Sequence, residues 1–216
     1  LRVILPEIEV LKSAKQDPKT HPEGDAFEHT IRVLAHLHLS PSKTLAFAAL
    51  LHDVGKGVMS GEAQGCEYPR HHEIGAAAAE KICRRLRFSN KERAAISNLV
   101  RFHSAPYALD TIKKSELKRM FQRLDEREFF ALLKADVLGG GGDMGVYRRA
   151  RRLHRQLSLE GIAPEPFISG EDLKKLGVKP GPSFGKIMAG IYDAQLNLEI
   201  KTRNEALELA KRLAMQ

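Results

Sequence analysis

Apolar residues recur every three or four positions along most of this 216-residue chain, which is the spacing of one face of an α-helix. No segment shows the strict alternation of apolar and polar residues that is typical of a half-buried β-strand. The sequence therefore predicts an all-α fold, a helical bundle. Helices are expected at residues 26–39, 44–54, 74–86, 92–102, 117–124, 128–138, 147–157, 184–196 and 205–213.

Signals for helix starts and for breaks agree with this pattern. Ser89 with Glu92 and Thr202 with Glu205 fit capping boxes, and Pro182 suits a first helical turn. Three segments break the helical pattern, namely the glycine-containing loop 55–69, the glycine run 139–142 and the segment 161–170. The segment 161–170 is the best candidate for a domain boundary. It predicts a main domain at residues 1–166 and a small helical C-terminal appendage at residues 167–216.

The composition is that of a folded globular protein, with 43% hydrophobic residues, 17 Gly and 10 Pro. No apolar run approaches the roughly 18 residues that span a bilayer, and no secretory leader is recognisable, so a soluble cytoplasmic protein without a membrane partner is expected. The chain opens on Leu1 within an apolar stretch, and further sequence is expected upstream. Cys66 and Cys83 fit neither a disulfide framework nor a zinc ribbon, so both are expected to be reduced thiols.

The formal net charge of +8, from 35 Lys and Arg against 27 Asp and Glu, favours polyanionic partners such as nucleic acid. An arginine-rich helix and the turn at residues 180–182 could both contact phosphates. Each also has a plain structural explanation, because a charged helix face is usually only solvated and Pro-Gly-Pro forms a turn without any ligand. The arginines of that helix are Arg148, Arg149, Arg151, Arg152 and Arg155.

His52 and Asp53 end the apolar helix predicted at residues 44–54. Adjacent helical residues point about 100° apart, so both can bind one ion only near the end of the helix, and other helices must supply further ligands. Imidazole and carboxylate together suit divalent transition metals and can also admit Mg or Mn. A His-Asp dipeptide alone is weak evidence, since a buried imidazole beside an exposed carboxylate would give the same pattern.

Further residues of the same types stand where other helices could bring them to this pair. His29 falls within the first predicted helix, and His71 and His72 stand at the start of the helix after the loop. His103 ends the following helix, and Asp136 ends a further one just before the glycine run.

In this order the segments HDVGK, HHEIGA, FH and KAD resemble the successive motifs of the HD superfamily, whose helix-borne His and Asp residues bind one or two metal ions. The ligand of the second motif commonly stands four residues before its glycine, here Gly75, which selects His71. His72 is then a substrate-facing group, a neighbour of the ligands or merely a residue of the helix N-terminus. The resemblance implies one or two divalent ions (Ni, Mn, Mg, Fe or Co) held by His29, His52, Asp53, His71, His103 and Asp136.

A divalent ion lowers the pKa of bound water and polarises a phosphoryl oxygen, so hydrolysis of a phosphate ester is expected, with Asp53 orienting or deprotonating the nucleophile. Lys56 matches a basic residue of the family and is a candidate for catalysis and phosphate binding, the alternative being an exposed loop lysine. Arg70 is a further catalytic candidate, although a surface role explains it at least as well. Capping of the first helix by Asp25 explains Glu23 and Asp25 at least as well as catalysis does.

Nearly the whole chain is similar to the HD body of bacterial tRNA nucleotidyltransferases, the CCA-adding enzymes. This resemblance rests on ILPEIEVLKSAKQDPKTHPEGDAFEHT, YPRHHEIGA, LKKLGVKPGPSFGKIM and TRNEALELAKRL, and the nucleotidyltransferase head has no counterpart in these residues. It implies a phosphodiesterase acting on a nucleotide or RNA phosphate such as a 2′,3′-cyclic phosphate. The alternatives are a non-catalytic body that binds tRNA, with the C-terminal appendage as a candidate contact, and a hydrolase of signalling nucleotides or dNTPs. The sequence gives no indication of the oligomeric state.

Overall fold

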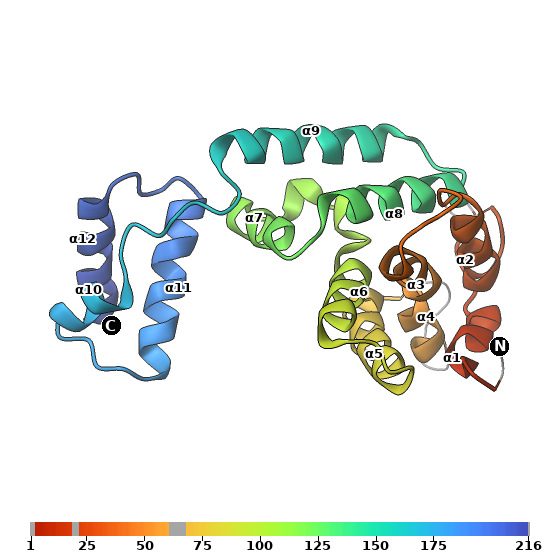
Figure 1. Ribbon diagram of the computed structural model, residues 1–216. Coiled ribbons are helices and arrows are strands. Elements are labelled where there is room, and N and C mark those ends of the chain that lie inside the picture. The colour runs from red at the N-terminus through yellow and green to blue at the C-terminus, as the bar shows by residue number, and fades with distance from the viewer. Residues whose placement is uncertain (1–2, 19–21, 61–67, 216) are drawn as a thin grey trace. The chain divides into compact units, whose positions relative to one another are not determined.

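The computed structural model describes residues 3–18, 22–60 and 68–215, and within these ranges the chain forms helices and no strand (Figure 1). The all-α prediction is therefore confirmed. The contacts divide the chain into two compact units. The first comprises residues 1–110 and 123–155, and the second comprises residues 111–122 and 156–216.

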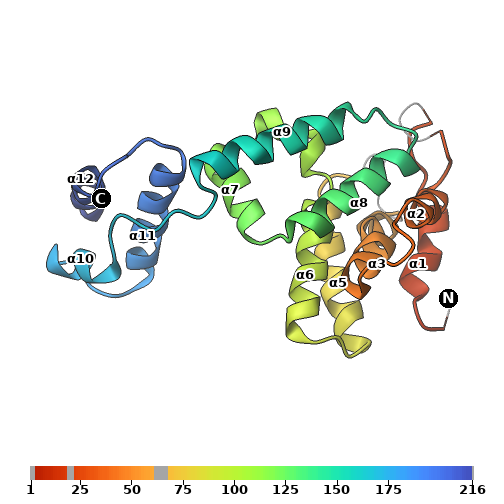
Figure 2. The same ribbon diagram turned by 45° about the horizontal axis from the view of Figure 1, so that its top comes forward.

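In the first unit the hairpin of α5 and α6 packs against α4 and α3, while α2 lies along α8 (Figures 1 and 2). The 3-10 turns η1 (Val10–Ser13) and η2 (Ala105–Tyr107) join helices of this unit, and α9 (Gly145–Glu160) contributes its first part. The other helices of the unit are α1 (Pro6–Glu9), α2 (Ala26–Ala35), α3 (Lys43–Leu51), α4 (Val54–Met59), α5 (His71–Arg85), α6 (Asn90–Phe102) and α8 (Glu126–Gly139).

The predicted start signals are present at three helices. The Asp25 side chain caps α2 by accepting hydrogen bonds from the backbone N–H groups of Phe27 and Glu28. Ser89 and Glu92 form the complete capping box of α6. At α12 (Arg203–Ala214) the Thr202 hydroxyl accepts from the backbone of Glu205, but the Glu205 carboxylate accepts from the N–H of Lys201 instead of closing the box.

The prediction of one helix to residue 54 followed by a loop is wrong. Helix α3 ends at Leu51, and a new short helix, α4, begins at Val54. Gly55 and Gly57 suggested a loop, but here they allow close packing. A Cβ at Gly55 would collide with the carbonyl oxygen of His71 and lie 2.8 Å from the backbone nitrogen of Gly75, so only glycine lets α4 approach the start of α5.

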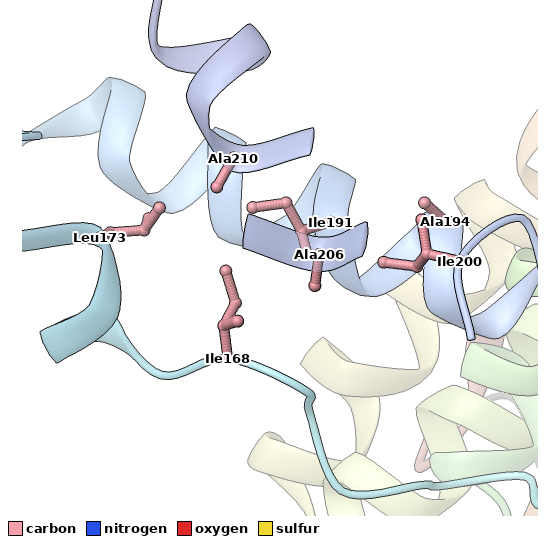
Figure 3. Packing of buried hydrophobic residues seen from close by; sticks show 7 residues of the cluster. All are labelled: Ile168, Leu173, Ile191, Ala194, Ile200, Ala206 and Ala210. Atoms are coloured by element: carbon pink, nitrogen blue, oxygen red, sulfur yellow. The ribbon is translucent and has the colours of Figure 1, made fainter. Parts of the chain in front are cut away.

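The second unit has its own apolar core, built mainly from α11 and α12 (Figure 3). Its helices are α7 (Lys114–Gln122), the last part of α9, α10 (Gly170–Lys175), α11 (Pro182–Leu196) and α12. Pro182 stands in the first turn of α11 as predicted. The domain boundary after residue 166 stays a prediction, because compactness does not test independent folding. The buried core residues are Ile168, Leu173, Ile191, Ala194, Ile200, Ala206 and Ala210.

Among the described residues, none of the helices has the length and apolar character that crossing a bilayer requires. Cys83 is a buried free thiol, and burial raises its pKa to about 11. Cys66, the other predicted free thiol, lies outside the described residues.

Candidate metal centre

The six predicted metal ligands lie together in the first unit, although they come from five places along the chain. His29 lies in α2, His52 and Asp53 form the junction of α3 and α4, and His71 begins α5. His103 follows α6 directly, and Asp136 lies in the last turn of α8. All are buried except His71, which is partly buried.

The junction between α3 and α4 explains how two adjacent residues can face one point. His52 keeps helical backbone angles at the end of α3, whereas Asp53 leaves them, with φ −103° and ψ 8°, and precedes α4. The chain direction thus changes between the two side chains. The His52 Nε2 atom lies 3.4 Å from the Asp53 Oδ2 atom.

The potential ligand atoms form two groups that share Asp53. One group is His29, His52 and Asp53, and the other is Asp53, His71 and His103. Within each group these atoms lie within 4.8 Å of one another. The Asp53 carboxylate therefore stands between two clusters of imidazoles.

Three of the histidines present a lone pair to the centre. The Nδ1–H groups of His52, His71 and His103 donate to the backbone carbonyls of Ala49, Tyr68 and Val100, at 2.7, 2.9 and 2.7 Å. A carbonyl only accepts, so Nδ1 carries the proton, and the neutral ring keeps a lone pair at Nε2. The Nε2 atoms of His71 and His103 lie only 3.3 Å apart. Two such lone pairs at this distance repel each other unless a proton or a cation lies between them.

The electrostatics of the centre also favour a cation. Burial works to raise the pKa of Asp53, but the ammonium group of Lys56 outweighs it and holds that pKa well below its usual range. Burial likewise opposes ionisation of Asp136, and the hydrogen bond from His29 outweighs it, so its pKa is also low. Burial lowers the pKa of His71 to about 4, which keeps this ring neutral at pH 7.

Two buried atoms that face the centre have no hydrogen-bond partner among the described residues, the Nε2 of His52 and the Oδ1 of Asp53. An unpaired buried polar atom is costly, and coordination of a divalent cation would satisfy such an atom. A mixed set of imidazole nitrogens and carboxylate oxygens suits first-row divalent metals. The residues present therefore fit a divalent metal ion.

Two residues that the sequence did not clearly assign contact the centre, Tyr107 through Asp136 and Glu23 through His29. His29 Nε2 lies 3.0 Å from Asp136 Oδ1, and the Tyr107 hydroxyl donates to Asp136 Oδ2 at 2.9 Å. On its other side, His29 Nδ1 lies 2.6 Å from Glu23 Oε1. Tyr107 was missed because it lies in the turn η2, where no helical periodicity marks the face that it presents.

A cavity of about 330 Å³ adjoins the centre and is lined by ligands as well as by Lys56, Ser104 and Tyr107. Lys56 is buried, so its interpretation as an exposed loop lysine is wrong. Its ammonium group donates to Asp53 Oδ2 at 2.7 Å and to Gln16 Oε1 at 2.6 Å. A positive charge therefore stands at the boundary between the metal centre and the cavity.

Arg70 and His72 do not line this cavity. The Arg70 side chain is 77% exposed and pairs with Glu73 at 2.6 Å. His72 is partly buried and packs its ring against that of His71, with 5.6 Å between the centroids. Of the two neighbouring histidines, it is His71 whose Nε2 faces Asp53, at 3.6 Å.

Comparison with known proteins finds a family match for part of this chain. Residues 26–129 match the HD domain family. A curated relative, the "Multifunctional CCA protein" of Nitrosococcus oceani, is 31% identical over 150 residues, which cover 64% of this chain and 36% of the relative. The match thus spans little more than a third of that relative's length. Residues 26–129 of this chain therefore form an HD domain, and the similarity to the CCA protein is consistent with an HD body of that kind of enzyme.

Proposed function

We propose that this chain is a metal-dependent phosphohydrolase that cleaves a phosphodiester of a nucleotide or of RNA, such as a 2′,3′-cyclic phosphate. The observation that carries the proposal is the position of Asp53 between two imidazole groups, with its Oδ1 and the His52 Nε2 buried and without hydrogen-bond partners among the described residues. Proteins with HD domains are typically metal-dependent hydrolases, and this chain contains such a domain.

His29, His52, Asp53, His71, His103 and Asp136 would hold one or two divalent ions, with Ni, Mn, Mg, Fe or Co as candidates. When bound, such an ion supplies Lewis acidity for a phosphoryl oxygen and lowers the pKa of a water molecule. Asp53 would orient the nucleophilic water or accept its proton.

The residues that line the cavity would bind and orient the substrate. The ammonium group of Lys56 is placed to contact a non-bridging phosphate oxygen, because it lines the cavity while bound to Asp53. The Tyr107 hydroxyl can donate to a second oxygen in exchange for Asp136. The cavity volume of about 330 Å³ lies within the range of small-molecule sites. Arg70, which pairs with Glu73 at the surface, is left out of the proposed catalytic set.

The test is a screen of purified, metal-free protein against each candidate metal with 2′,3′-cyclic AMP, 3′,5′-cyclic AMP, phosphomonoesters and dNTPs. Asp53→Asn keeps the shape of the side chain and removes its charge, so we expect it to abolish hydrolysis. His38→Ala is a matched control, because this histidine is exposed and lies outside the centre. Activity that survives in Asp53→Asn refutes the proposed site. Preferential cleavage of dNTPs would instead favour a nucleotide-pool or signalling role.

A second candidate function, the binding of tRNA, is favoured by the CCA protein relative and by the exposed arginines of α9. Arg149, Arg152 and Arg155 form no ion pair within the described part of the chain, whereas Arg148 and Arg151 pair with Asp143 and Glu126. Residues 167–216 are a further proposed contact.

Each phosphate contact adds about 0.9 to the slope of log affinity against log salt on duplex nucleic acid. The triple variant Arg149→Gln, Arg152→Gln and Arg155→Gln should therefore bind tRNA with a shallower salt dependence, measured by filter binding. An unchanged slope excludes these three arginines as the contact.

A further inference from the structure

Every histidine of the metal centre has a partner at its Nδ1 atom, but the partner of His29 differs in kind from the others. His52, His71 and His103 each donate to a backbone carbonyl three positions earlier. His29 Nδ1 instead lies 2.6 Å from a carboxylate oxygen of Glu23. The Glu23 side chain is fully buried in this pair, and that of His29 is 3% exposed.

The position of His29 within α2 explains this difference. His52 and His103 directly follow the ends of their helices, and His71 begins one. At a helix end, the backbone carbonyl three positions before the histidine is within reach of its ring Nδ1–H group. His29 lies inside α2, where the carbonyl of Asp25 accepts the N–H of His29 itself and that of Ala26 accepts the Thr30 hydroxyl. An acceptor for the ring must therefore come from outside the helix.

The segment before α2 supplies that acceptor. Gly24 has a φ of 122°, which turns the chain between Glu23 and Asp25. Asp25 then caps the helix by accepting from the N–H groups of Phe27 and Glu28, at 3.0 and 2.9 Å. The two neighbouring carboxylates thus have separate partners: Asp25 binds the backbone of α2, and Glu23 binds a ring of the metal centre.

We propose that Glu23 is a positioning residue of the metal centre, whose carboxylate fixes the ring of His29 and strengthens it as a ligand in the half formed with His52 and Asp53. A carboxylate behind a ligating imidazole sets its tautomer and raises its basicity, and loss of such a partner typically weakens metal binding about 10- to 100-fold. The other half, formed by Asp53, His71 and His103, has backbone carbonyls behind its rings and does not depend on Glu23. This inference rests on the metal-dependent function proposed above.

The experiment is a titration of the metal-free full chain with Co²⁺, followed by calorimetry and by the visible absorption of the bound ion. His52→Ala and His103→Ala assign the binding events to the two halves. One binding event should be lost in His52→Ala, and we expect Glu23→Gln to weaken the affinity of that event by about 10- to 100-fold. The affinity of the other event should stay unchanged. Asp25→Asn is the matched control, since it removes the adjacent charge but keeps a good N-cap. Glu23→Asp keeps the charge and serves as a second variant if Glu23→Gln does not fold; a smaller loss is expected.

The outcomes separate this inference from the proposed function. If the wild-type chain binds Co²⁺ and Glu23→Gln binds it as Asp25→Asn does, the role of Glu23 is refuted and the metal centre stands. Equal weakening of both events also refutes it, because that result indicates a general loss of packing. If the wild-type chain binds one ion only, weaker binding of that ion in Glu23→Gln but not in Asp25→Asn still supports the inference. A wild-type chain that binds no Co²⁺ overturns the proposed metal-dependent function itself.

Discussion

Lys118 in the second unit offers a sharp test of how a buried charge contributes to the stability of this fold. Its side chain is fully buried, and its Nζ atom has no hydrogen-bond partner among the described residues. The nearest opposite charge is the Glu160 carboxylate, whose Oε2 lies 3.5 Å away and also lies 3.2 Å from Lys114 Nζ. Removing Glu160 therefore leaves a buried ammonium beside a second positive charge.

The magnitude follows from the geometry. Two unit charges 3.5 Å apart attract by about 5 kcal/mol at an effective dielectric constant of about 20. Breaking a buried pair by removing one partner typically costs about 3–5 kcal/mol, and the Glu160 side chain is 21% exposed, which favours the lower end of that range. We therefore expect Glu160→Gln to lower the free energy of unfolding by about 3 kcal/mol.

The assay is urea denaturation followed by circular dichroism, with Lys118→Met and the double variant beside Glu160→Gln. Lys118→Met keeps the length of the side chain and removes the charge, so a change of less than about 1 kcal/mol is expected, and the double variant should recover most of the loss. Lys114→Met, at a side chain that is 35% exposed, should cost less than about 1 kcal/mol. The reasoning is refuted if Lys118→Met destabilises the protein as much as Glu160→Gln does.

Two further predictions concern the first unit. Gly55→Ala should destabilise the protein by about 1–3 kcal/mol in urea denaturation, because its Cβ would collide with α5, whereas Gly185→Ala in α11, with no atom within 4 Å of its added Cβ, should be neutral or stabilising. Equal losses in both variants would contradict the packing argument. The hydrogen bonds from Lys43 and from Ser89 lower the pKa of Glu92 from 4.5 to about 2. A carboxyl whose pKa is lower in the folded state stabilises the fold above the unfolded pKa, and this contribution is lost as the pH falls from about 4.5 towards 2. The melting temperature of Glu92→Gln should therefore lie below that of the wild type at neutral pH and converge with it near pH 2. A difference that persists there refutes the assignment.

Helical periodicity predicted the fold well because most helices here bury one face, and α2 and α6 carry start signals that act within a single turn. It failed at α4, since Gly55 and Gly57 are needed for packing against α5 and η1, and a single sequence does not distinguish a glycine required by a neighbour from one that breaks a helix. It also missed α10, whose six residues make fewer than two turns and are too few to show a period.

The candidate site was predictable to the extent that its chemistry stands in recognisable local motifs. The order of His29, His52, Asp53, His71, His103 and Asp136 indicated which residue types should meet, and the structure brings all six together. Gln16 and Tyr107 carried no such signal, because each reaches the centre through a contact with a residue far away in the sequence. Proximity in sequence to His71 was the only signal for Arg70, whose side chain is 77% exposed, pairs with Glu73 and does not line the cavity.

The way in which the imidazoles are held suggests why this centre uses helix ends. A histidine just after or at the start of a helix can donate its Nδ1–H to a nearby backbone carbonyl, which fixes the ring without a second buried side chain. A histidine inside a helix lacks that carbonyl and needs a second buried group, here Glu23, with the desolvation that this entails. Placing three of four imidazoles at helix ends therefore keeps the number of buried carboxylates low. Of the buried carboxylates of the centre, Asp53 is shared by both halves, whereas Glu23 and Asp136 lie beside His29. Because this negative charge is added on the side of His29 and His52, a cation should bind that half of the centre most tightly.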